Sequence, residues 1–127
     1  MNKLIFFVDD DKMILNLMEY TFSGRNEYTV KSFKKGEDCL ELLNENPDLI
    51  ILDHSFFLTD SKYKKGLDIL KEIRSQNLNI PVIILTGEQD DSIQSDYDKL
   101  GVSGFIIKDS FFIDSLIEKV DLFFKQK

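Results

Sequence analysis

The sequence is poor in cysteine and has no tryptophan, with Cys39 as the single thiol among 127 residues. One cysteine cannot form a disulfide within the chain, and it excludes a zinc site made of several thiolates. Leu42 and Leu43 share a helical face with Cys39, so we expect the thiol to be buried as a small hydrophobic group. No charged neighbour favours its thiolate form, so we expect no redox role.

Long apolar runs are also missing. The run that ends at Val8 is followed at once by three aspartates, which is unlike a secretion signal. No stretch approaches the roughly 20 apolar residues that cross a membrane. The net charge of −7 disfavours non-specific binding to nucleic-acid phosphates. We therefore expect a cytoplasmic protein that contacts neither membranes nor, directly, nucleic acid.

Length and composition predict one folded domain. A chain of 127 residues with 43% hydrophobic and 31% charged residues is long enough to bury a core. The sequence contains no internal repeat, low-complexity segment or linker. We therefore predict a single domain over residues 1–127.

Short apolar runs alternate along the chain with amphipathic segments. We predict strands over residues 3–8, 28–33, 49–52, 80–85 and 105–107, and helices over residues 12–22, 36–46, 66–76, 90–100 and 111–124. Strands joined through single helices pair in parallel. Because the central runs LIIL and IPVIIL are apolar throughout, helices should cover both faces of the sheet. The predicted fold class is α/β, a doubly wound sheet of five parallel strands.

Four of these strands end in polar residues. Asp9 and Asp10 follow the first strand, Asp53 the third, Thr86 the fourth and Lys108 the fifth. Ligands of such sheets bind at the carboxyl ends of the strands, so we expect these side chains to lie at one edge.

The chemistry of this group of residues favours phosphoryl transfer. Crowded carboxylates repel one another, and their oxygen atoms are suitable ligands for Mg²⁺. A metal ion, an amine and a hydroxyl around one carboxylate provide the positioning and charge neutralisation that phosphoryl transfer requires. We predict Mg²⁺ as the cofactor and Asp53 as the nucleophile that becomes an aspartyl phosphate.

Five motifs together resemble the receiver domain of two-component response regulators, of the type found in chemotaxis regulators. They are VDDD, LIILD, GLDILKEIR, PVIILTG and GVSGFIIK, and they extend over essentially the whole chain. The resemblance implies a flavodoxin-like sheet with strand order 2-1-3-4-5. It also implies that Asp9, Asp10, Asp53 and the backbone carbonyl of Ser55 bind the metal ion.

The same resemblance implies a signalling role. Asp53 would accept a phosphoryl group from a histidine kinase or a histidine phosphotransfer protein, and Lys108 would pair with a phosphoryl oxygen. Thr86 and Phe105 would be the switch residues that change the surface of the fourth helix, fifth strand and last helix. That surface would bind a downstream protein target. The resemblance leaves undecided whether the chain also forms a homodimer. The domain would catalyse only its own phosphorylation and dephosphorylation, so we do not expect this protein to be an enzyme that acts on other substrates.

The sequence departs from the family pattern in two places. Phe56 and Phe57 replace the usual Met-Pro pair after the phosphoacceptor, and the segment 54–65 is longer than in typical members. This segment either closes over the site or forms a docking element. Asp109 replaces the proline that usually follows the lysine through a cis bond. Since a non-proline cis bond is costly, we expect a trans bond after Lys108.

Two alternatives remain open at this point. One is a degenerate receiver that binds partners without being phosphorylated. The other is a haloacid-dehalogenase-like phosphatase, because Asp9 and Asp11 after an apolar strand imitate that family's motif. Met13 stands where the motif requires threonine or valine, and Asp53 would then have no purpose.

Several further residues have simpler interpretations. We expect Asp11 to cap the first helix, and His54 to lie at the edge of the site without binding metal. Glu88 is at a position that tunes acyl-phosphate hydrolysis in the family. On the last helix we expect a core-facing stripe of Ile113, Leu116, Ile117, Val120 and Phe124. Phe112 and Phe123 should lie at the edge of this stripe and Leu122 opposite it, and we hypothesise that these three residues form part of a partner surface.

Overall fold

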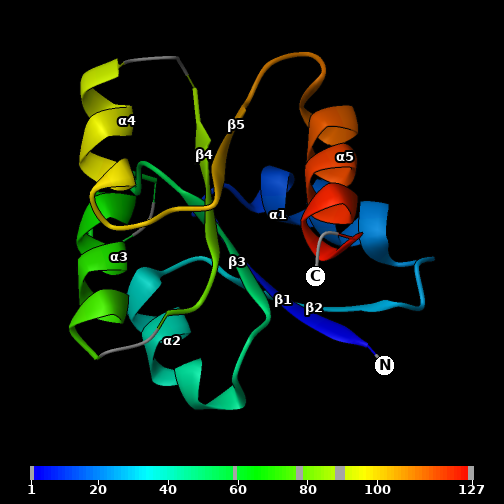
Figure 1. Ribbon diagram of the computed structural model, residues 1–127, viewed down its shortest axis with the longest axis horizontal. Helices are drawn as coiled ribbons and strands as arrows, with labels where there is room; N and C mark the ends of the chain where they lie inside the picture. Colours follow the sequence, from blue (N-terminus) through cyan, green and yellow to red (C-terminus); the bar gives the residue numbers. More distant parts are fainter. Residues whose placement is uncertain (1, 59, 77–78, 88–90, 126–127) are drawn as a thin grey trace.

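The computed structural model describes residues 2–58, 60–76, 79–87 and 91–125. Five parallel strands form one sheet in the order β2-β1-β3-β4-β5 (Figure 1). The strands are β1 (Lys3–Val8), β2 (Tyr28–Phe33), β3 (Leu49–Asp53), β4 (Val82–Thr86) and β5 (Gly104–Ile107). The flavodoxin-like fold class and strand order predicted from the sequence are confirmed.

A layer of helices covers each face of the sheet (Figure 1). One layer consists of α1 (Lys12–Phe22) and α5 (Phe112–Lys125). The other consists of α2 (Gly36–Glu41), α3 (Gly66–Ser75) and α4 (Asp91–Asp98). Within the described ranges, no helix combines the length and the apolar character that crossing a membrane requires.

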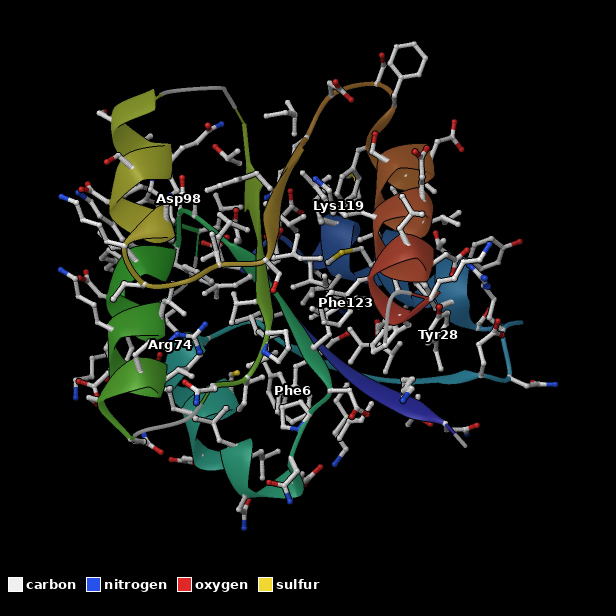
Figure 2. All side chains as sticks on the ribbon, in the orientation of Figure 1. Phe6, Tyr28, Arg74, Asp98, Lys119 and Phe123 are labelled. Carbon is white, nitrogen blue, oxygen red and sulfur yellow. The ribbon has the colours of Figure 1, made fainter. Side chains whose placement is uncertain are left out.

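Neighbouring residues of β1 belong to opposite cores. Ile5 and Phe7 pack with the layer of α1 and α5, whereas Phe6 and Val8 pack with the layer of α2, α3 and α4. Figure 2 labels Phe6 beside α2. Because successive side chains of a strand point to opposite faces, a sheet covered on both sides needs apolar residues at every position. This requirement explains the uninterrupted apolar runs of the sequence.

The predicted helix over residues 36–46 is wrong in its second half. The α-helix ends at Glu41, and a short 3-10 helix, η1 (Leu43–Glu45), follows it. Asn46 has a φ of 58°, in the left-handed region that asparagine tolerates better than most residues. This turn ends the helical segment before Pro47. Cys39 of α2 is fully buried as expected, and burial raises the pKa of its thiol to about 12.

The orientation of α5 also differs from the prediction. Phe112, which we placed at the edge of the core stripe, is buried, and it forms one line with Leu116 and Val120. Ile113 and Phe124 pack only partly against the core. Nearly every turn of this helix carries apolar residues on two sides, so the packing of the helix against the sheet determines which of them are buried.

Gly66, the first residue of α3, lies against the end of β3. Its amide donates a hydrogen bond to the carbonyl oxygen of His54 at 2.8 Å. A Cβ atom at this position would overlap the carbonyl oxygen of Asp53 and would lie 3.1 Å from the hydroxyl of Tyr97. Glycine is therefore required for α3 to begin beside Asp53.

We predict that Gly66→Ala lowers the free energy of unfolding by about 2 kcal/mol or more, because the backbone around Asp53 must move. Gly24→Ala is the matched control, since a Cβ atom there has no neighbour within 4 Å. Its effect should stay within about 0.5 kcal/mol. Chemical denaturation measures both values, and equal stability of the two variants would contradict the close packing at Gly66.

Candidate functional site

The register of the sheet brings the predicted site residues to one edge. Val8 of β1 pairs with Leu52 of β3, so the residues that follow them, Asp9 and Asp53, are neighbours. Leu85 of β4 pairs with Asp53. The last pair between β4 and β5 is Thr86 with Ile107, and Lys108 comes next.

The side chain of Lys108 lies between two carboxylates. Its Nζ atom is 2.9 Å from Oδ1 of Asp53 and 2.8 Å from Oδ2 of Asp9. The described residues contain no cis peptide bond, so the bond between Lys108 and Asp109 is trans, as expected. The amide of Lys108 donates to the carbonyl oxygen of Thr86 at 2.8 Å, which holds this segment against β4.

Three carboxylates are close enough to share one ion. Asp9, Asp10 and Asp53 each offer an oxygen, and these oxygens all lie within 4.8 Å of one another. They line a cavity of about 330 Å³ to which Ser55 and Lys108 also contribute. All three aspartates are buried.

Burial and mutual repulsion shift the pKa values of these groups. Burial, with the neighbouring charge of Asp9, raises the pKa of Asp53 to about 7 although Lys108 opposes the shift. Burial likewise raises the pKa of Asp9, against the opposing effect of Lys108. For Lys108, burial lowers the pKa, but Asp53 and Asp9 outweigh it and the net shift is upward. The edge of the sheet therefore carries more negative charge than Lys108 neutralises.

These residues fit a divalent cation. Oδ2 of Asp9 is buried, and its partner among the described residues is the ammonium group of Lys108. Carboxylate oxygens are the ligands that Mg²⁺ prefers, usually together with water. Asp9, Asp10 and Asp53 therefore offer the type of ligand, the charge and the space that a magnesium ion requires.

The two predicted switch residues lie on adjacent strands. Thr86 is buried at the end of β4. Phe105 of β5 is half-buried, and its ring centroid lies 6.1 Å from that of Tyr97 in α4. Lys119 of α5 donates to the carbonyl oxygen of Phe105 at 2.8 Å (Figure 2 labels Lys119). Phe105 is thus in contact with both α4 and α5.

The simpler expectations have mixed outcomes. Asp11 caps α1, because its Oδ1 atom accepts a hydrogen bond from the amide of Met13 at 2.9 Å. His54 lines the cavity as expected, and its Nδ1 atom lies 2.7 Å from the hydroxyl of the fully buried Tyr97. Glu88 lies outside the described residues.

Sequence reasoning missed one contact of the site. The amide of Leu58, in the long segment after β3, donates to Oδ2 of Asp10 at 2.7 Å. Phe57 and Leu58 also line the cavity, although both side chains are largely exposed. A backbone amide has no residue-specific signature, so the unusual length of the segment was the sole signal that could have indicated this contact.

The fold and the acidic edge define a receiver domain. The family model of the response regulator receiver domain matches residues 5–121. The chain therefore belongs to the receiver domain family of two-component response regulators.

Individual relatives agree with this assignment. The chain is 35% identical over 92 residues to the alkaline phosphatase synthesis transcriptional regulatory protein PhoP of Bacillus subtilis, covering 72% of this chain and 36% of that protein. It is 31% identical over 120 residues to the DNA-binding transcriptional regulator NtrC of Escherichia coli, covering 93% of this chain and 24% of NtrC. The chain thus spans well under half the length of these two relatives. Among solved structures, the receiver domain of the Francisella response regulator 1452 has a TM-score of 0.83 at 30% identity, covering 98% of each chain.

The raised pKa of Asp53 predicts a pH-dependent stability in the absence of metal. The folded-state pKa of about 7 lies above that of the unfolded chain, so the stability that protonation contributes is present at low pH and is lost as the pH rises through about 7. Asp53→Asn removes the charge and should gain stability relative to the wild type over this range, by up to about 1.4 kcal/mol per pH unit. Chemical denaturation in a chelator at several pH values measures the difference in unfolding free energy between Asp53→Asn and the wild type. This difference should grow in favour of the variant as the pH rises toward about 7.

Proposed function

We propose that this receiver domain is a switch activated by phosphorylation of Asp53 in a Mg²⁺-dependent reaction. The observation that carries the proposal is the position of Lys108, whose Nζ atom lies 2.9 Å from Asp53 and 2.8 Å from Asp9. A receiver without phosphoacceptor chemistry would not require a lysine and three buried acids at the same edge. The intact set of residues therefore favours an active receiver over a degenerate one.

Each residue has a defined part in the proposed reaction. Asp9, Asp10, Asp53 and the backbone carbonyl of Ser55 would hold Mg²⁺, which when bound neutralises charge on the phosphoryl oxygens. An oxygen of Asp53 attacks phosphorus, and the bond between phosphorus and the donor atom breaks. Lys108 pairs with a phosphoryl oxygen, and the hydroxyl of Thr86 donates a hydrogen bond to another. Positioning and charge neutralisation by these groups provide the catalysis.

The switch follows from the new charge on Asp53. The phosphoryl group attracts the hydroxyl of Thr86, and the movement of Thr86 leaves space that the ring of Phe105 fills. Because Phe105 contacts Tyr97 of α4 and its carbonyl is bound by Lys119 of α5, this movement changes the surface formed by α4, β5 and α5. The contacts that exist only in the phosphorylated state bias the equilibrium between the two surfaces.

Response regulators interact with histidine kinases and with downstream targets. We propose that the donor here is a histidine kinase or a histidine phosphotransfer protein, and that the altered surface binds a downstream protein or a second copy of the chain. PhoP and NtrC are transcriptional regulators by name, but the net charge of −7 gives this domain little affinity for DNA. The domain would catalyse only its own phosphorylation and dephosphorylation and would turn over no other substrate.

The phosphatase hypothesis fits the chain poorly. It requires the second aspartate of the first motif, Asp11, to act in catalysis. The carboxylate of Asp11 instead caps α1 through the amide of Met13, and the side chain of Met13 is exposed.

Phosphorylation can be tested directly by mass. We expect the wild type, incubated with Mg²⁺ and an acyl phosphate, to gain the mass of one phosphoryl group. Asp53→Asn should gain none, and the wild type in a chelator should react far more slowly. Failure of the wild type to react with any small phosphodonor would support the degenerate receiver instead.

The switch can be followed with a single fluorophore. The chain has no tryptophan, so Phe105→Trp introduces the sole indole. We expect its emission to shift when Mg²⁺ and an acyl phosphate are added, because the ring becomes more buried. The shift should be absent when Thr86→Ala or Asp53→Asn is added to this variant. An unchanged spectrum in a variant that mass spectrometry shows to be phosphorylated would contradict the proposed movement.

A further inference from the structure

The β3–α3 loop, of which the structure describes residues 54–58 and 60–65, is folded back on itself at its base. Ser55 and Lys65 form an antiparallel bridge, and the amide of Phe56 donates to the carbonyl oxygen of Lys64 at 2.8 Å. The side chain of Phe56 is fully buried in the core beneath α2, α3 and α4. The loop is therefore held to the body of the domain at its base.

One arm of this loop contacts the acidic site. The amide of Leu58 lies 2.7 Å from Oδ2 of Asp10, whose side chain is almost completely buried. A hydrogen bond from an amide to a carboxylate is stronger than one between neutral groups. This contact therefore restricts the rotation of the Asp10 carboxylate.

The other arm of the loop is held by α2. Oε1 of Glu37 accepts a hydrogen bond from the hydroxyl of Ser61 at 2.9 Å, and Oε2 accepts one from the amide of Lys62 at 2.9 Å. Ser61 is buried. Burial by itself would raise the pKa of Glu37, but hydrogen bonds from the amides of Lys62 and Glu37 itself and from Ser61, together with the charge of Lys35, outweigh burial and lower the pKa. Both oxygens of one ionised carboxylate are thus used to hold the loop.

We propose that Glu37 is a positioning residue for the metal site, and that it acts by fixing the β3–α3 loop so that the amide of Leu58 orients Asp10. The effect on Mg²⁺ rests on the proposed function, whereas the effect on the loop does not. Groups that orient metal ligands without touching the ion commonly change metal affinity on the order of 10-fold. Glu37 lies in α2, whereas Asp10 follows β1, so the two residues are far apart in the sequence.

The test compares Glu37→Ala with Asp38→Ala, its neighbour in the same turn of α2. Asp38 is exposed, has the same charge and has no hydrogen bond or ion pair with the described residues, so it controls for lost charge and for changes to α2. Two quantities are measured: hydrogen exchange of the Leu58 amide in a chelator, and the Mg²⁺ dissociation constant from titration followed by NMR.

We expect Glu37→Ala to reduce protection of the Leu58 amide and to raise the Mg²⁺ dissociation constant on the order of 10-fold. Asp38→Ala should change neither quantity. Glu37→Gln, which keeps the size of the side chain and one acceptor oxygen, should give an intermediate result. A purely structural role would lower overall stability without a selective change at Leu58.

The outcomes separate this inference from the proposed function. If the wild type binds Mg²⁺ and Glu37→Ala binds it equally well, this inference is overturned and the proposed function stands. If the wild type does not bind Mg²⁺, both are overturned. If Glu37→Ala fails to fold, Ser61→Ala removes one of the two hydrogen bonds, and unchanged metal binding with an unchanged Leu58 amide would overturn the inference.

Discussion

The ion pair of Lys108 with Asp9 and Asp53 is the interaction on which the arrangement of this site depends. Two buried carboxylates that face each other are unfavourable unless a cation lies between them. Lys108 provides one positive charge, whereas three buried aspartates occupy the same edge. The folded domain therefore contains an excess of negative charge at a place with room for an ion. The proposed binding of a divalent cation and the proposed phosphoryl transfer would both use this imbalance.

The parallel sheet makes such crowding possible. The charged and polar side chains of the site lie at or just beyond the ends of four strands, of which β3 and β4 are buried along their whole length. Because Val8 pairs with Leu52, the next residues are brought together whatever their mutual repulsion. Hydrophobic burial of the strands thus offsets the electrostatic cost at their ends. In the sequence, this arrangement is visible as the abrupt change from the apolar run LIIL to the charged residue Asp53.

Residue patterns predicted those parts of the structure that depend on side-chain type. The alternation of strands and helices and the burial of Cys39 are properties of this kind. The burial of Phe112 was missed because apolar residues lie on two sides of α5, and the sheet decides between them. The break after Glu41 lies at Leu42, whose backbone has a φ of −109° and a ψ of 15°, and the left-handed Asn46 ends the 3-10 helix that follows. The contact of Leu58 with Asp10 uses a backbone amide, which every residue except proline possesses.

The loop after β3 contacts the proposed metal site through its backbone. The loop leaves the strand order unchanged, yet it adds a hydrogen-bond donor to one of the acids. A carboxylate whose orientation is already fixed loses less conformational freedom when an ion binds, so the same ligands bind more tightly. The amide of Leu58 donates to Oδ2 of Asp10 and so limits the orientations that this carboxylate can take. Differences in loop length can therefore tune the affinity of a site whose own residues stay the same.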